Sequence, residues 1–170
     1  MDYYSEVLAR YKNKGLLVDS SLFLLLVVGL LDPRQIERFK RTQVFDPGAF
    51  DLLKRVVRLF ARVVTTPNVL TEVSNLLGQL PEEGRERYSS VFADLAGRTE
   101  EEYRPSRGLV AHDHFAKFGL TDSSIVDTCK GKYLVLTVDF PLFHYLTNVG
   151  IDAINFNHLR GLAWFADSLS

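Results

Sequence analysis

Residues 16–21 read Leu16-Leu17-Val18-Asp19-Ser20-Ser21, a short apolar run that ends in an acidic residue. Three apolar residues before a polar break are typical of a strand that is buried on both faces of a parallel sheet. The next ten residues, 22–31, contain no polar side chain. A membrane span needs roughly 20 residues, so this run predicts a helix buried on all sides, capped by Ser20 or Ser21.

Further strands and helices alternate along the chain. Asp32-Pro33 and Thr66-Pro67 both resemble a helix cap followed by proline in the first turn. Alternating strands and helices predict an α/β fold, with a central parallel sheet of four to five strands and helices on both faces, in one domain over 1–170. The predicted strands are 16–18, 62–65, 132–138 and 151–156. One predicted helix begins at residue 33, a second spans 49–61 after a turn at 45–48, and a third runs from 67 to about 77. The stretch 81–102 is predicted to be a charged helical segment at the surface, and 103–109 to be irregular. Further helices are predicted after a cap at Thr121, over 140–149, and after a cap at Asn157.

Composition excludes several classes of protein. The net charge is −1, so no overall basic field indicates a nucleic-acid partner, and any such partner would need a local basic patch. The single cysteine, Cys129, excludes an internal disulfide and a cysteine-rich zinc site, and its apolar surroundings predict a place in the core. We see no signal peptide or membrane segment and expect a cytoplasmic protein.

Four acidic residues each follow a predicted strand or lie early in a predicted helix. No lysine or arginine lies within three residues of any of them. An acid in such an apolar setting is costly unless a cation compensates its charge. The carboxyl ends of parallel strands meet at one edge of the sheet, so we expect the four to converge there and to hold a hard divalent cation. They are Asp19, Glu72, Asp122 and Asp139.

The segments around these acids resemble the PIN-domain ribonuclease family. The resemblance lies in residues 17–21, 66–73, 119–126 and 136–142, in their order and spacing. It implies a parallel sheet flanked by helices, bound Mg²⁺ or Mn²⁺, and endonucleolytic cleavage of single-stranded or structured RNA that leaves a 5′-phosphate. The family's acidic positions correspond to the same four residues, and its hydroxyl residue before the last acid corresponds to Thr137. Many small members are toxins that a partner protein inhibits, so an antitoxin and a homodimer are among the expected partners.

The chemistry of phosphodiester cleavage assigns provisional roles to these residues. A divalent ion supplies an activated water and neutralises charge on the phosphate. We expect Asp19, Asp122 and Asp139 to bind it directly or through water, and Glu72 to be a ligand or to orient the attacking water. Thr137 and Ser20 are candidates for hydrogen bonds that orient a carboxylate or a phosphate.

Simpler explanations exist for some of these acids. The charge of Asp122 can interact favourably with the dipole of the helix that it begins, and Asp139 can be a helix N-cap. A purely structural role is harder to find for an acid at the position of Asp19. Asp127 is either a fifth acid at the rim or a solvated residue.

Other functions remain open at this point. The alternative is a non-catalytic PIN-like module that binds RNA or protein. A haloacid-dehalogenase-like phosphatase needs a second aspartate where Ser21 stands, and a receiver domain needs an acidic pair and a late lysine that are missing. Two basic clusters are candidates for phosphate contacts, although either can be an ordinary solvated face. They comprise Lys54, Arg55, Arg58 and Arg62, and Arg34, Arg38, Lys40 and Arg41.

Overall fold

The strands form one parallel five-stranded sheet in the computed structural model, which describes residues 3–168 and their side chains through residue 163. The strand order is β3-β2-β1-β4-β5. Every neighbouring pair is parallel, with Leu17 opposite Val64 on one side and opposite Val135 on the other. The strands are β1 (Leu16–Val18), β2 (Val63–Thr65), β3 (Glu100–Glu101), β4 (Leu134–Thr137) and β5 (Ala153–Asn155).

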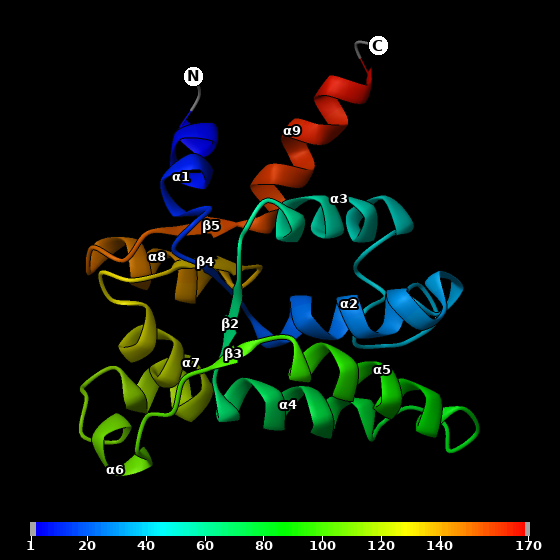
Figure 1. Cartoon of the computed structure of the whole chain (residues 1–170), viewed down its shortest axis with the longest axis horizontal. Helices are drawn as coiled ribbons and strands as arrows, with labels where there is room; N and C mark the ends of the chain where they lie inside the picture. The colour runs from blue at the N-terminus through cyan, green and yellow to red at the C-terminus, as the bar shows by residue number, and fades with distance from the viewer. Residues whose placement is uncertain (1–2, 169–170) are drawn as a thin grey trace.

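Helices cover the sheet, as Figure 1 shows, with α2 to α5 gathered on one side and α6 to α8 on the other. This arrangement confirms the predicted α/β class with a central parallel sheet flanked by helices. The helices are α1 (Tyr3–Tyr11), α2 (Ser20–Leu31), α3 (Pro47–Arg58), α4 (Pro67–Leu77), α5 (Arg85–Gly97), α6 (Ser106–Leu109), α7 (Phe115–Cys129), α8 (Phe140–Asn148) and α9 (Phe156–Ser168), with one 3₁₀ turn, η1 (Pro33–Gln35).

Helix α2 is the central buried helix of the fold, as its unbroken apolar sequence predicts. Residues 22–29 of α2 are all buried, and α2 packs against α3, α4 and α5. Gly29 lets α3 approach closely, because a Cβ there would lie 2.5 Å from the ring of Phe50. Cys129 is buried and free, which confirms its predicted place in the core.

The strand order reverses at β1, and this reversal locates the most favourable site for function. The chain moves outward from β1 to β2 and β3, then crosses back to add β4 and β5 on the other side of β1. In open parallel sheets, ligands bind beyond the carboxyl ends of the two strands that flank such a reversal. Here these strands are β1 and β4, which are followed by Asp19 and by Val138-Asp139.

Several predicted helix starts are wrong. The Asp32-Pro33 signal produces only η1, although Asp32 does cap it by accepting from the Arg34 amide. Residues 45–48 are the start of α3, since Asp46 caps that helix and Pro47 is its first residue. Helix α7 begins at Phe115 and bends at Gly119, whose φ of +75° breaks the helix before Thr121. Thr121 therefore does not cap α7.

The other differences concern short elements. The stretch 81–102 contains α5 but ends in β3, which pairs with β2 and was not predicted. The stretch 103–109, predicted as irregular, includes the single-turn helix α6. The amide of Asn157 donates to the side chain of Asn155, so Asn155 performs the capping role predicted for Asn157. No helix in the described part of the chain is long and apolar enough to cross a membrane.

Candidate metal centre

Asp19 is buried where β1 passes into α2. Its Oδ1 accepts a hydrogen bond from the Leu22 amide at 2.9 Å, so Asp19 is the N-cap of α2. Its Oδ2 accepts from the Thr137 hydroxyl at 2.5 Å and from the Val138 amide at 3.0 Å. The predicted caps, Ser20 and Ser21, are wrong, and so is the expectation that an acid at position 19 has few structural reasons. One carboxylate both caps α2 and ties β1 to the end of β4.

Asp139 begins α8 beside Asp19. Its Oδ1 accepts from the Leu142 amide at 2.7 Å, which confirms that Asp139 is an N-cap. Its own amide donates to the Thr137 hydroxyl oxygen at 3.0 Å. Thr137 therefore links the two acids, since it donates to one and accepts from the backbone of the other. The Asp139 Oδ2 accepts no hydrogen bond from the described residues and is free to bind a ligand.

Glu72 reaches the same edge of the sheet from α4. Its Oε2 accepts from the Ser20 hydroxyl at 3.0 Å, which brings the side chain to the start of α2. The cap and proline at Thr66-Pro67 start α4 as predicted, with the Thr66 hydroxyl accepting from the Val69 amide. Glu72 is exposed, so a ligand in solvent can reach its carboxylate.

A buried hydroxyl contact sets α7 against α4. The hydroxyls of Thr66 and Ser124 are 2.8 Å apart, and Ser124 also donates to the Thr121 carbonyl. The helix resumes after the bend at Gly119, so Asp122 lies within its first new turn and close to this contact. Sequence reasoning missed the contact because a serine inside a helix carries no signal for its partner.

The four carboxylates interact electrostatically with one another. Burial, reinforced by the negative charges of Asp139, Asp19 and Glu72, raises the pKa of Asp122 to about 7. Burial also raises the pKa of Asp19, although its three hydrogen bonds oppose that shift. Within residues 3–163, none of the four acids forms an ion pair with a lysine, arginine or histidine.

The donor set suits a hard divalent cation. Such ions prefer carboxylate oxygens and often bind through one or two carboxylates and several waters. Over the described residues, no three acidic, histidine or cysteine side chains are already drawn together as a formed ligand set. Carboxylates without an ion repel one another, and a protonated Asp122 reduces that repulsion. The acids best able to coordinate are Asp139 through its free oxygen, Asp122, and Asp19, with Glu72 at the solvent side.

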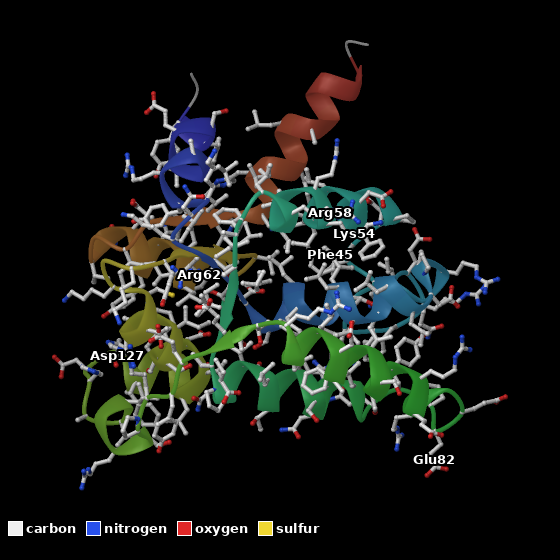
Figure 2. All side chains as sticks on the ribbon, in the orientation of Figure 1. Phe45, Lys54, Arg58, Arg62, Glu82 and Asp127 are labelled. Carbon is white, nitrogen blue, oxygen red and sulfur yellow. The ribbon has the colours of Figure 1, made fainter. Side chains whose placement is uncertain are left out.

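Asp127 is an ion-pair residue rather than a fifth acid of this group. One carboxylate oxygen lies 3.2 Å from Nε of Arg104 and the other lies 3.4 Å from Nε2 of His112. Figure 2 shows Asp127 on the α7 side of the molecule. Its charge is therefore satisfied by two neighbours, unlike the charges of the four acids.

The first basic cluster is remote from the acids. Arg62 directly precedes β2 and pairs with Glu100, so it lies at the amino end of the strands, opposite the acidic edge. Figure 2 shows Lys54 and Arg58 on α3, which lies on the far side of α2 from α4. Lys54 also pairs with Asp51 at 2.8 Å. The face formed by these residues is a solvated surface and does not adjoin Glu72.

Comparisons with known proteins leave the question of function to the geometry. No family model matches this chain, and no curated protein matches it. A similar solved structure is a domain of a functionally unknown protein from Methanocaldococcus jannaschii DSM 2661, at 17% sequence identity and a TM-score of 0.43. The match covers 83% of this chain and 89% of that one. A similarity at this level supports no argument about activity.

Proposed function

We propose that this protein is a divalent-metal-dependent endoribonuclease that hydrolyses RNA phosphodiester bonds with Mg²⁺ or Mn²⁺. The observation that carries the proposal is the convergence of Asp19, Glu72, Asp122 and Asp139 at one edge of the sheet, where burial and the three other charges raise the pKa of Asp122 to about 7. A fold that concentrates uncompensated negative charge at the carboxyl edge of its sheet loses stability there. Such a cost is typical of functional sites and is removed when a cation binds.

The residues of the site divide into fixed and free groups. Asp19 is fixed by three hydrogen bonds, and the Thr137 hydroxyl sets its position relative to Asp139. Fixed carboxylates define the place of a cation with little reorganisation. Asp139 keeps one oxygen free, and Glu72 keeps Oε1 free at the solvent-exposed side. Glu72 is therefore the residue best placed to accept a proton from, or orient, a water molecule that attacks a phosphate.

A divalent cation bound by these acids would lower the pKa of a water molecule and neutralise negative charge on the phosphate. The chain itself supplies the remaining requirements. Glu72 and Asp139 are exposed at the edge of the sheet, so a polymer can reach their carboxylates from solvent. No lysine, arginine or histidine among the described residues pairs with the acids, and charge neutralisation is thus left to the cation.

The proposal is tested by cleavage of a panel of labelled RNAs by the purified protein, with Mg²⁺, with Mn²⁺ and with EDTA. We expect cleavage that needs the metal, leaves 5′-phosphate ends and is lost in Asp122→Asn and Asp19→Asn. Asp94→Asn is the matched control, because Asp94 is an exposed aspartate on α5 whose partner among the described residues is Arg98. Cleavage in EDTA, or equal cleavage by Asp122→Asn and the control, would contradict the proposal. RNA binding without any cleavage would favour the non-catalytic module.

A further inference from the structure

A groove beside Glu72 is not explained by the metal centre. It has a volume of about 410 Å³, within the range of small-molecule sites. One wall is α4, and the other is formed by residues 103–106 together with Leu120 and Thr121. Glu72 belongs to its lining, so the groove begins where the four acids end.

The α4 wall presents hydrogen-bonding groups that are not used within the protein. Asn68, Thr71 and Asn75 line the groove, and their side chains form no hydrogen bond with the described residues. Asn68 and Asn75 are seven residues apart, about two helical turns, and therefore share one face of α4. Each amide offers both a donor and an acceptor. Mixed donors and acceptors match the edge of a nucleobase better than they match a phosphate, which only accepts.

The opposite wall presents apolar surface. Tyr103 is 68% exposed and Leu120 is 37% exposed. Nη1 of Arg104 donates to the Tyr103 carbonyl at 3.1 Å. The same guanidinium pairs with Glu102 at 2.8 Å and with Asp127 at 3.2 Å. The exposed aromatic ring of Tyr103 is a suitable surface for base stacking.

The charges of the groove disfavour a phosphate inside it. All three nitrogens of the Arg104 guanidinium already donate to oxygens of the protein or pair with them. The only other charged group of the lining is Glu72, which repels an anion. The chemistry of the groove therefore favours a flat, uncharged group with a polar edge, next to a site that acts on a phosphate.

We propose that this groove binds an unpaired nucleobase of the RNA, stacked on Tyr103 and hydrogen-bonded by Asn68 and Asn75, next to the phosphate that is cleaved. The inference rests on the proposed function, because it takes RNA as the substrate, and it deepens that function by assigning a base-binding groove beside the four acids. A paired base cannot enter, since its edge and both faces are occupied within the duplex.

The test measures binding of a short labelled single-stranded RNA in EDTA, which separates the groove from metal chemistry. Stacking of one base contributes about 1–3 kcal/mol, so Tyr103→Ala should weaken binding by about 5- to 150-fold. Tyr103→Phe, which keeps the ring, should restore binding to within about twofold. Tyr3→Ala is the control, because Tyr3 is an exposed tyrosine on α1, outside the groove, and should change nothing. Asn68→Ala with Asn75→Ala should weaken binding and alter the preference among bases.

The outcomes distinguish this inference from the proposed function. Wild-type cleavage with unchanged binding and KM in Tyr103→Ala would overturn the base site and leave the nuclease. Binding that depends on Tyr103 in a protein that cleaves no RNA with any metal would support the base site and overturn the nuclease. Equal binding of single strands and duplexes would also overturn the base site, as would absence of RNA binding by the wild type in EDTA. Circular dichroism of each variant excludes unfolding as the cause.

Discussion

Replacement of Asp122 by asparagine should stabilise the metal-free protein, and the gain should depend on pH. The pKa of Asp122 is about 7 in the folded protein against 3.8 ordinarily. Between these values the folded state binds more protons than the unfolded state, so stability falls as pH rises from about 4 to about 7. The full difference corresponds to at most about 4 kcal/mol. Asparagine has nearly the same shape and no charge, so it removes this loss.

The assay is urea unfolding of Asp122→Asn, wild type and the Asp94→Asn control in EDTA, at about pH 4 and about pH 8. At pH 8, Asp122→Asn should be more stable by about 2–4 kcal/mol, which corresponds to a melting temperature higher by on the order of 10 °C for a chain of this size. At about pH 4 the two should differ by less than about 1 kcal/mol, because Asp122 is then protonated in the folded state and nearly half protonated in the unfolded state. Saturating Mn²⁺ should reduce the advantage by stabilising the wild type more than Asp122→Asn. Equal or lower stability of Asp122→Asn at pH 8 would refute the electrostatic reasoning.

Three further substitutions test the packing and hydrogen bonds that position the site. Thr137→Val removes the hydroxyl that donates to the buried Asp19 carboxylate, so it should lower the free energy of unfolding by about 1–3 kcal/mol and raise the pKa of Asp19 further. Urea unfolding and Mn²⁺ titration measure these effects. Unchanged stability would argue against this hydrogen bond. Asp19→Ala should be less stable than Asp19→Asn by about 1 kcal/mol, because asparagine still caps α2, and equal unfolding midpoints would contradict the cap. Gly29→Ala should lower the free energy of unfolding by about 1–3 kcal/mol, because the added Cβ would meet the Phe50 ring. An unchanged melting temperature would mean that α3 shifts to accommodate the methyl group.

The elements with strong local signals could be predicted from the sequence. The strand 16–18 and the helix 67–77 have the predicted bounds, because an apolar run with a polar stop and a cap followed by proline are local features. Strand β3 could not be predicted, since its two residues are both glutamates. Its extended form depends on pairing with β2 at the sheet edge. The bend at Gly119 was missed because the sequence shows a helical pattern but not the sign of φ at a glycine.

Part of the candidate site could be predicted for the same reason. Asp19 and Asp139 follow strands, and parallel strands place their carboxyl ends together. The approach of Asp122 to the others depends on the Thr66–Ser124 contact between α4 and α7, which no periodicity reveals. The groove beside Glu72 depends on how residues 103–106 fold back toward α4, which is likewise a tertiary feature. The sequence therefore indicates strand-end acids better than it indicates the helix-borne residues around them.

The most direct test of the account is the number of protons released when Mn²⁺ binds, measured by titration calorimetry at about pH 7 in buffers of different ionisation enthalpy. Because the pKa of Asp122 is about 7, this carboxyl is about half protonated there, and a cation among the acids must displace that proton. We predict that the wild type releases about half a proton more than Asp122→Asn when Mn²⁺ binds, because only the wild type carries the Asp122 carboxyl. Absence of Mn²⁺ binding, or binding with the same proton release in both proteins, would contradict this prediction.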